Sequence, residues 1–405
     1  MLSQTTKDII KSTVPVLEMH GEHITTRFYE RLFDNEPSML DIFNQTNQRR
    51  GQQQTALANA LYAAALHIDH IEDILPVVRQ VGHKHRGLGV KPEHYPIIGE
   101  NLLAAMKEVL GDAATDDIIG AWAQAYEMIA GAFIDVEQAM YTQAATQVGG
   151  WDGFRPFIVK KKVQESDVIT SFYLEPQDGG AIATYEPGQY LTLKVNIPGL
   201  AHTQRRHYSL SGQPGQSYYR ISVKREEAHD GWPDGLVSTY LHRQVHVGDI
   251  LEVAAPAGDF TLDVTTPRPI VFLSGGVGMT PLLSMLHSLL AYDPEHEVTY
   301  VHAALHGRVH AFQTEMESLA STHPSLRYAI VYENPEKEDT ERAHFLRTGR
   351  IDAPLLSTLI APESEFYICG PQPFMQAMVT ALSQLNVSPD QIHYEFFGPQ
   401  RSLTA

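Results

Sequence analysis

The chain has very little cysteine and no long apolar segment. Cys369 is the one cysteine among 405 residues, so no disulfide can form within the chain and no cluster of thiolates can hold a metal. No uninterrupted apolar run approaches the ~18 residues that a membrane-spanning helix needs. The first residues, MLSQTTKD, lack the basic segment followed by an apolar one that marks a secreted protein. We therefore expect a cytoplasmic protein.

Positive charge is also scarce. The chain has 30 Lys and Arg residues against 48 Asp and Glu residues, which gives a formal net charge of −18. A surface this acidic repels phosphate backbones and anionic lipids, which argues against nucleic acid and membranes as partners. Nucleotides are not excluded, because they need only a local basic pocket. Histidine is plentiful at 20 residues, so a metal ligand has to be identified by its position.

Residues 1–146 have a helical pattern almost throughout. Apolar residues recur every three or four positions, and short breakers at 35–37, 44–51 and 89–92 separate the segments. Strand patterns are nearly absent from this stretch. About seven helices of ordinary length fit into it, which predicts an all-α domain.

Residues 151–264 have the pattern of a β domain. The runs 190–195 and 219–223 alternate with a period of two, and turn sequences such as 187–188 and 247–249 bound the strands. Short strands at this spacing predict a closed antiparallel barrel.

Residues 267–405 alternate strands with helices. An apolar helix over 282–290 follows the first strand and a glycine-rich turn. The expected strands include residues 270–273, 298–301, 328–331 and 366–368. This alternation predicts an α/β domain built on a parallel sheet.

Two histidines lie close together in the predicted helix 74–88. His85 falls on an apolar face of this helix, whereas His83 lies off it. The apolar face consists of Leu75, Val78, Val81, His85 and Leu88. A histidine on such a face is, by itself, more often a hydrogen-bonded core residue than a metal ligand. Other residues of this domain also have ordinary interpretations one at a time, such as Tyr29 in the core and Gln53 on the surface.

Together, residues of the helical domain resemble the globin family and, within it, the flavohaemoglobins of bacteria and yeast. The family's pattern is present as Tyr29, Ile42-Phe43-Asn44, Gln53, Leu57, Lys84-His85 and the segment KPEHY at 91–95, followed by GENLL at 99–103. The resemblance covers the whole domain. It implies that His85 is the proximal ligand of a haem b iron.

The same resemblance assigns roles to neighbouring residues. Tyr95 and Glu137 match positions beside the proximal histidine, where a carboxylate orients the ring and increases its electron donation to iron. Tyr29 would donate a hydrogen bond on the distal side, and these three are the expected catalytic residues. The expected pocket residues are Phe43, Gln53 and Leu57.

The β region contains the motif Arg-x-Tyr-Ser at 206–209. Four residues are a weak signal alone, and Arg206 and Lys224 could be solvated charges on a strand face. The order of the motif, after PGQY at 187–190 and before Lys224, resembles the ferredoxin–NADP reductase superfamily, whose barrel binds FAD. The resemblance implies that Arg206 pairs with the pyrophosphate, Tyr208 packs on the isoalloxazine and Ser209 hydrogen-bonds flavin N5. Further implied FAD contacts are Tyr190, His207, Lys224, Gly235, Val237, Ser238, Phe396, Phe397, Gly398 and Pro399.

A glycine-rich segment, LSGGVGMTP at 273–281, follows a predicted strand and opens a predicted helix. Glycines there let backbone N–H groups approach a pyrophosphate. Pro281 stands where a Rossmann dehydrogenase has its third glycine, so the segment instead resembles the reductase superfamily. Thr280 as N-cap and Pro281 as first helical residue predict the helix start. Expected nicotinamide dinucleotide contacts are Gly275, Gly276, Val277, Gly278, Met279, Thr280, Pro281, Cys369 and Gly370.

Four further residues have roles that the sequence leaves less defined. Cys369 would either assist hydride geometry or be a small buried residue, and both interpretations stay open. Glu395 and Lys84 match residues that tune the redox potentials of flavin and haem. Arg308 is a candidate for binding a 2′-phosphate, which would admit NADPH, although NADH is the family's usual donor.

The resemblance to flavohaemoglobins implies a nitric oxide dioxygenase. Electrons would pass from NAD(P)H through FAD to haem, and nitric oxide and dioxygen would become nitrate, with no obligatory protein partner. The alternatives are an NADH-dependent reductase of hydroperoxides, quinones or ferric iron, and a haem-based oxygen-binding protein. A lipid or an azole could also occupy the distal pocket.

Overall fold

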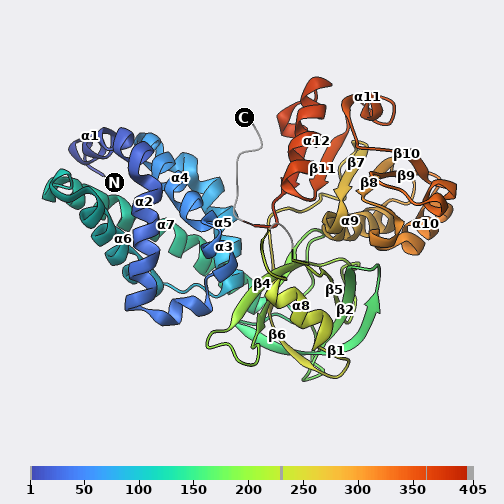
Figure 1. Cartoon of the computed structure of the whole chain (residues 1–405), viewed down its shortest axis with the longest axis horizontal. Coiled ribbons are helices and arrows are strands. Elements are labelled where there is room, and N and C mark those ends of the chain that lie inside the picture. The colour runs from blue at the N-terminus through green and yellow to red at the C-terminus, as the bar shows by residue number, and fades with distance from the viewer. Residues whose placement is uncertain (1, 229–230, 362, 399–405) are drawn as a thin grey trace. The chain divides into compact units, whose positions relative to one another are not determined.

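The computed structural model describes residues 2–228, 231–361 and 363–398. The chain forms two compact units, one built mainly from the first 154 residues and the other from most of the remainder. Figure 1 colours the chain from its N-terminus to its C-terminus. In the described part of the chain, no helix is both long and apolar enough to span a membrane.

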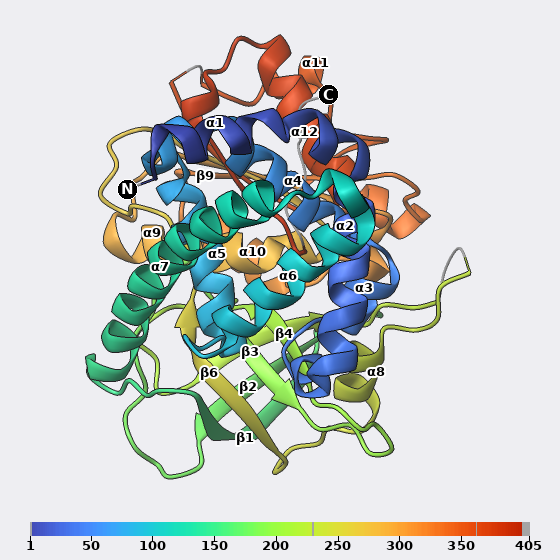
Figure 2. The same ribbon diagram turned by 90° about the vertical axis from the view of Figure 1, so that its left-hand side faces the viewer.

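The first unit is helical. Its α-helices are α1 (Gln4–Ser12), α2 (Val14–Asn35), α3 (Gln45–Arg49), α4 (Gln52–Leu66), α5 (Leu75–Leu88), α6 (His94–Leu110) and α7 (Asp116–Thr146). Short 3₁₀ turns connect several of them, at Pro37–Asp41, Ile68–Ile74 and Gly111–Ala113. The longest helix, α7, has 31 residues and is seen along its length in Figure 2.

Local sequence explains where α5 and α7 begin and end. Thr115 caps α7, since its hydroxyl accepts a hydrogen bond from the N–H of Ile118, and Asp116 and Asp117 follow in the first turn, where the helix dipole favours negative charge. Gly89 ends α5 with φ of 76°, a left-handed conformation that favours glycine.

Helices α6 and α7 approach each other closely at Gly99. A Cβ at this position would overlap the ring of Tyr126, so only glycine allows this packing. The hydroxyl of Tyr126 then donates to the carbonyl oxygen of Tyr95 at 2.6 Å. The two contacts fix Tyr95 against α7, the helix that also carries Glu137.

The apolar face predicted for 74–88 is confirmed only in part. Val78 is almost fully buried, but Leu75, at the first position of α5, is 40% exposed. Small residues at Gly82 and Gly87 are buried in its place. Periodicity alone overestimated the burial of the first turn, because it cannot show that a helix end projects beyond its neighbours.

The second architecture is a barrel of six strands. They are β1 (Phe154–Gln164), β2 (Ile169–Pro176), β3 (Tyr190–Val195), β4 (Gln204–Ser209), β5 (Tyr219–Lys224) and β6 (Ile250–Ala257). Their order in the sheet is β4-β3-β6-β1-β2-β5. An antiparallel bridge between Leu210 and Ile221 joins the two ends of this order, so the sheet closes on itself, as the sequence predicts.

The third architecture is a parallel sheet with helices on both faces. Its strands are β7 (Ile270–Gly275), β8 (Val298–Ala304), β9 (Leu326–Tyr332), β10 (Phe345–Thr348), β11 (Glu365–Cys369) and β12 (Ile392–Glu395). The accompanying helices are α9 (Met279–Tyr292), α10 (Gln313–Thr322), α11 (Ala353–Leu356) and α12 (Gln372–Gln384). The strands lie in the order β10-β9-β8-β7-β11-β12. Along the chain, strands β8 to β10 are added on one side of β7, and β11 and β12 are added on its other side, so the strand order has a switch point between β7 and β11.

Both faces of the parallel sheet are buried. Ile270 and Phe272 of β7 pack with α9, whereas Val271 and Leu273 face the cluster that includes α12. Fully buried strands of this kind read as continuous apolar runs. The switch point between β7 and β11 matters for function, because ligands of open α/β sheets bind outside the carboxyl ends of the strands at such a point.

The predicted start of α9 is wrong by two residues. The helix begins at Met279 with Gly278 as its N-cap, after a 3₁₀ turn at Gly276–Gly278. The hydroxyl of Thr280 bonds the carbonyl oxygen of Val277 at 3.0 Å instead of capping the helix. Pro281 is therefore inside the first turn, where its missing N–H is tolerated because no intrahelical partner exists there.

An ion pair connects the barrel to the parallel-sheet domain. Arg220 on β5 donates to both carboxylate oxygens of Glu315 on α10, at 2.8 and 3.0 Å. His287 on α9 contacts Glu315 at 2.6 Å. Burial alone would raise the pKa of the Glu315 carboxyl, but the hydrogen bonds from His287 and Arg220 outweigh burial and lower the pKa to about 2.

We expect Glu315→Gln to destabilise the protein by about 3–5 kcal/mol at pH 7, because it leaves the buried Arg220 without its charged partner. A carboxyl with a lowered folded-state pKa contributes stability above its unfolded pKa, and this stability is lost as the pH falls through the folded value. The difference between wild type and variant should therefore shrink between pH 4.5 and pH 2. Thermal unfolding across this pH range measures it.

Glu317→Gln is the matched control on the same helix. Glu317 is 43% exposed and lies 3.9 Å from Arg342, so its loss should change stability by less than about 1 kcal/mol. Equal effects of the two substitutions at pH 7 would contradict the proposed importance of the Arg220–Glu315 pair.

Candidate functional site

A hydrogen-bonded triad with a buried carboxylate forms where α5, α6 and α7 meet. His85 Nδ1 lies 2.7 Å from Glu137 Oε1 and 3.2 Å from the hydroxyl of Tyr95. That hydroxyl donates to the same carboxylate oxygen at 2.6 Å. Glu137 is only 2% exposed. The structure thus brings together three of the predicted site residues from different helices.

The triad decides which nitrogen of His85 carries the proton. A carboxylate oxygen accepts hydrogen bonds, so His85 Nδ1 must be the donor. This tautomer leaves Nε2 with a free lone pair, which is the form that ligates a metal. Because the His85 side chain remains 32% exposed beside the ring of Phe133, its free edge is accessible.

These residues fit a haem iron better than a metal held by protein alone. Within the described ranges, no group of three or more His, Cys, Asp or Glu side chains could hold a metal ion. A metal at His85 would need its other ligands from elsewhere, and a porphyrin supplies four nitrogens. The ring of Phe133 lies 5.4 Å from that of His85, and Phe133 is one of the partly buried apolar residues that pack on the helical core, with Ile97, Ile98, Leu103 and Ile134.

Tyr29 lies in a cluster of aromatic rings. Its ring centroid is 5.9 Å from that of Phe33 and 5.6 Å from that of Phe43. Tyr29 is 7% exposed, and burial raises the pKa of its hydroxyl well above the usual value. The phenol therefore stays protonated and able to donate a hydrogen bond at physiological pH.

Gln48 is a polar residue of this cluster that the sequence analysis missed. It interacts with the Tyr29 hydroxyl, and its amide nitrogen donates to Gln53 Oε1. Gln53 is therefore linked to Tyr29 through Gln48. Leu57, four residues along α4, packs against the same core. Gln48 occupies α3, in the polar stretch that the sequence pattern assigned to a breaker, so no periodic signal could identify it.

The predicted flavin motif lies on β4 and faces β3. The rings of Tyr190 and His207 are 4.6 Å apart, and Ser209 is buried. Arg206 and Tyr208 alternate with these residues along β4, and both are half-buried. Alternation on a strand places Arg206 and Tyr208 on one face of the barrel wall, as the family motif requires.

A tight turn precedes α8 (Leu236–Arg243). A Cβ at Gly235 would collide with Ser238 Oγ and with Glu226, so the turn requires glycine. Ser238 Oγ bonds the carbonyl oxygen of Gly235 and the N–H of Glu226, which holds the turn together. The hydroxyl of Ser238 is thus engaged within the turn, whereas Val237 presents a backbone N–H of the helix's first turn, which suits an anion such as pyrophosphate.

Lys162 fixes the other end of α8. Its ammonium donates to the carbonyl oxygens of His242 and Val245, at 2.6 and 2.8 Å. A cation at a helix C-terminus complements the helix dipole. Through α8, Lys162 on β1 therefore helps to fix the orientation of the predicted phosphate-binding turn, which precedes this helix.

The stretch after β12 exposes the ring of Phe397. Phe397 is 50% exposed, whereas Phe396 is half-buried and its ring packs against that of Tyr394. A large exposed ring just after β12 fits the predicted flavin-covering residue. Gly398 is the next residue, and Pro399 lies outside the described residues.

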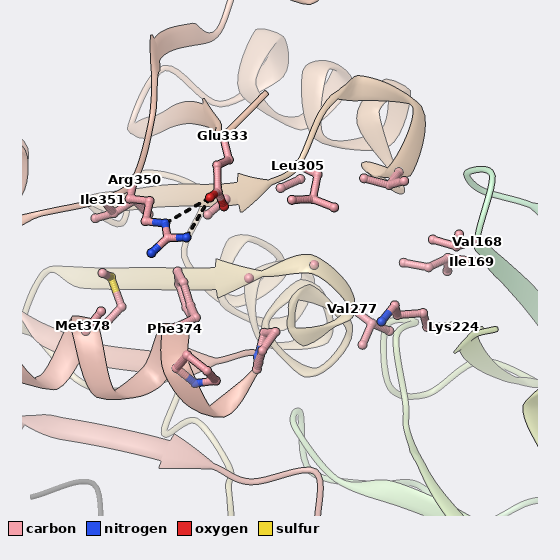
Figure 3. Close-up of a pocket in the computed structure, with 18 of the residues that line it drawn as sticks. Val168, Ile169, Lys224, Val277, Leu305, Glu333, Arg350, Ile351, Phe374 and Met378 are labelled. Atoms are coloured by element: carbon pink, nitrogen blue, oxygen red, sulfur yellow. Dashed lines mark hydrogen bonds and ion pairs between the residues drawn. The ribbon is translucent and has the colours of Figure 1, made fainter. Parts of the chain in front are cut away.

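A cavity of about 590 Å³ lies along the carboxyl ends of the parallel strands. Figure 3 shows residues of the barrel, including Val168, Ile169 and Lys224, at one end, and Glu333 and Arg350 at the other. Among the predicted dinucleotide contacts, those that line the cavity are Gly275, Gly276 and Val277.

The glycines of this cavity fit a dinucleotide. Gly276 has φ of 53°, and a Cβ there would meet no atom within 4 Å, so the backbone is open to a ligand. A Cβ at Gly278 would overlap the carbonyl oxygen of Cys369, and one at Gly370 would press on Gly275. The loops that follow β7 and β11 therefore pack together through glycines at the switch point of the strand order.

Cys369 does not have the properties of a nucleophile. It is fully buried, and burial raises the pKa of its thiol well above the usual value. Its sulfur bonds the carbonyl oxygen of Glu395, which is its partner in the β11–β12 register. Glu395 itself is half-buried at the end of β12, and Lys84 precedes His85 on α5. Met279, Thr280 and Pro281 are buried in the first turn of α9.

Arg308 is not among the residues that line the cavity. It pairs with Asp167 at 2.8 Å and with Glu336 at 3.6 Å. Arg350, which the sequence analysis did not single out, lines the cavity instead. The geometry thus gives no support to Arg308 as a phosphate ligand.

Three domain families match the chain in the predicted order. Residues 26–133 match the globin family, residues 156–262 match an oxidoreductase FAD-binding domain, and residues 272–380 match an oxidoreductase NAD-binding domain. These matches confirm the predicted fold class and the three predicted cofactor-binding domains.

Similar proteins extend over the full length. A flavohemoprotein of Halalkalibacterium halodurans is 53% identical over 100% of this chain and 98% of its own length. The crystal structure of a Malassezia yamatoensis flavohemoglobin with bound FAD and haem covers 98% of this chain and 100% of that one, with a TM-score of 0.84 at 28% identity. The FAD/NAD-binding domain of a nitric oxide dioxygenase from Vibrio cholerae covers 60% of this chain and 99% of that one, with a TM-score of 0.55 at 40% identity. The chain belongs to the flavohemoprotein family.

Proposed function

We propose that this protein is a nitric oxide dioxygenase that converts nitric oxide and dioxygen to nitrate, with electrons from NADH. The observation that carries the proposal is the His85–Glu137–Tyr95 triad, since a histidine held by a buried carboxylate favours oxygen activation over reversible storage. The similar Vibrio cholerae domain, which comes from a nitric oxide dioxygenase, supports the same choice.

Bound together, the nicotinamide, FAD and haem supply the conversion of a two-electron donor into single electrons at an iron centre. The chain's own residues bind and orient these groups. His85 would ligate the haem iron, and Arg206, Tyr208 and Ser209 would hold the flavin. The whole path lies in one chain, so we propose no obligatory protein partner and a cytoplasmic location.

Glu137 would act through His85. A carboxylate that accepts a hydrogen bond from Nδ1–H makes the imidazole a stronger electron donor at Nε2. Tyr95 donates to the same oxygen and so keeps the carboxylate in place. Because this carboxylate is buried, its interaction with His85 is only weakly screened by solvent.

Tyr29 would act on a small ligand bound in the haem pocket. Its protonated phenol can donate a hydrogen bond to a small ligand on which negative charge develops, and Gln48 can orient that phenol. Phe33, Phe43 and Leu57 exclude water and admit small apolar gases. The same apolar walls would accept a lipid chain or an azole.

The direct test is consumption of nitric oxide by the purified, cofactor-loaded protein. With NADH and oxygen present, we expect one nitrate for each nitric oxide consumed, as measured with a nitric oxide electrode and nitrate analysis. Without oxygen, consumption should nearly stop. Turnover that needs no oxygen, or NADH oxidation that depends on hydroperoxide, quinone or ferric iron instead, would replace the dioxygenase with a reductase.

Tyr29→Phe should lower nitric oxide consumption about tenfold to a hundredfold, because a hydrogen bond to a charged group stabilises by about 1.5–3 kcal/mol. Dioxygen dissociation from the reduced protein, followed by flash photolysis, should accelerate by a similar factor. Tyr62→Phe removes a hydroxyl from a half-buried tyrosine of the same core and should change neither rate. If both variants behaved alike, Tyr29 would have no distal role.

Glu137→Gln should weaken electron donation by His85, because a neutral amide oxygen accepts a weaker hydrogen bond from Nδ1–H than a carboxylate does. We expect a lower iron–histidine stretching frequency in the resonance Raman spectrum of the reduced protein, together with slower nitric oxide consumption. Glu127→Gln, an exposed residue of the same helix, is the matched control. An unchanged stretching frequency in Glu137→Gln would rule out this role.

A further inference from the structure

One end of the nucleotide cavity contains a single carboxylate bound to a single guanidinium. Glu333 Oε1 accepts hydrogen bonds from Arg350 at 2.7 and 3.2 Å, and Figure 3 shows the pair inside the lining. The other charged side chains that line the cavity are Lys224 and Glu227, and both come from the barrel domain. The two ends of the cavity therefore differ in origin, since the barrel domain supplies one charged pair of residues and the parallel-sheet domain supplies the other.

The backbone fixes where this pair stands. Glu333 directly follows β9, and its N–H donates to the carbonyl oxygen of Ala304 at the end of β8. The loop that carries Arg350 is tied to β9 as well, since the N–H of Gly349 donates to the carbonyl oxygen of Tyr332 at 2.8 Å. Gly349 has φ of 113°, which favours glycine in this tight turn. The Glu333–Arg350 pair is thus a defined feature of the sheet edge.

The barrel identifies which end receives which part of a dinucleotide. Hydride transfer requires the nicotinamide to reach the flavin, so the nicotinamide end must be the one lined by Val168, Ile169 and Lys224. Gly275 is the last residue of β7 and Gly276 begins the turn that follows it, between the two ends of the cavity, where a pyrophosphate fits. The adenosine then extends across β8 to Glu333 and Arg350. This step rests on the proposed function.

We propose that Glu333 selects NADH over NADPH, and that Arg350 is a 2′-phosphate ligand which Glu333 keeps occupied. The carboxylate can accept hydrogen bonds from the ribose hydroxyls of an adenosine, whereas it repels the two negative charges of a 2′-phosphate. It also binds the one guanidinium that lines this end of the described cavity. Glu333 therefore opposes the 2′-phosphate twice, by repulsion and by occupying its counter-ion.

The test measures binding of adenosine fragments to the holoenzyme by titration calorimetry. The probes are 5′-AMP and adenosine 2′,5′-bisphosphate, which differ only by the 2′-phosphate. Wild type should bind 5′-AMP more tightly. Glu333→Gln should shift the ratio of the two affinities toward the bisphosphate by about tenfold or more, and the same shift should appear in kcat/KM for NADPH against NADH. Glu333→Gln/Arg350→Ala should lose most of this gain.

Glu336→Gln is the matched control, because it removes the same charge from a nearby residue outside the cavity lining. Its affinity ratio should equal that of wild type. A wild type that binds both probes equally, or a Glu333→Gln variant no different from Glu336→Gln, would overturn the proposal. The calorimetry needs neither oxygen nor nitric oxide, so a protein that failed the dioxygenase test but gave the expected ratios would lose only the proposed reaction.

Discussion

The carboxylate of Glu137 accepts hydrogen bonds from His85 and from Tyr95. The ability of the helical domain to present His85 as a metal ligand depends on this buried carboxylate. Without it, the histidine could take either tautomer, and its free nitrogen would not be defined. A buried carboxylate is tolerated only where donors surround it. The long helix α7 provides the charge, and the close approach of α6 at Gly99 provides the second donor. Packing at a glycine and chemistry at a histidine are thus coupled.

Most of the architecture could be predicted because its signals are local. Period-two alternation identified β3 and β5, and continuous apolar runs identified β7 and β9, within two residues of their observed ends. Periodicity also placed His85 on an inward face, although only the family resemblance indicated a metal ligand. Two predictions were wrong, because Leu75 is exposed instead of buried and α9 begins two residues earlier than predicted. In both cases the outcome depends on how a helix end meets its surroundings, which periodicity does not contain.

Side-chain partners from distant parts of the sequence could not be predicted. Gln48 stands between Tyr29 and Gln53 only because α2, α3 and α4 meet, and its own neighbours in sequence are polar. Arg308 was a candidate for a phosphate ligand as a cation that related flavohaemoglobins need not have, yet Asp167, about 140 positions earlier in the chain, binds it. Arg350 lines the cavity because a turn returns it to the end of β9. Such pairings follow from topology and not from local pattern.

The acidic composition has a consequence for how the nucleotide is held. With a net charge of −18, cations near the cavity find carboxylates close by. Lys224 pairs with Glu226 at 3.2 Å, and Arg350 pairs with Glu333. A dinucleotide therefore meets few uncompensated positive charges, and its pyrophosphate must rely on backbone N–H groups at the glycine turn that precedes α9. These backbone donors bind the pyrophosphate that NADH and NADPH share. Discrimination between the two dinucleotides therefore depends on side chains such as Glu333 and Arg350.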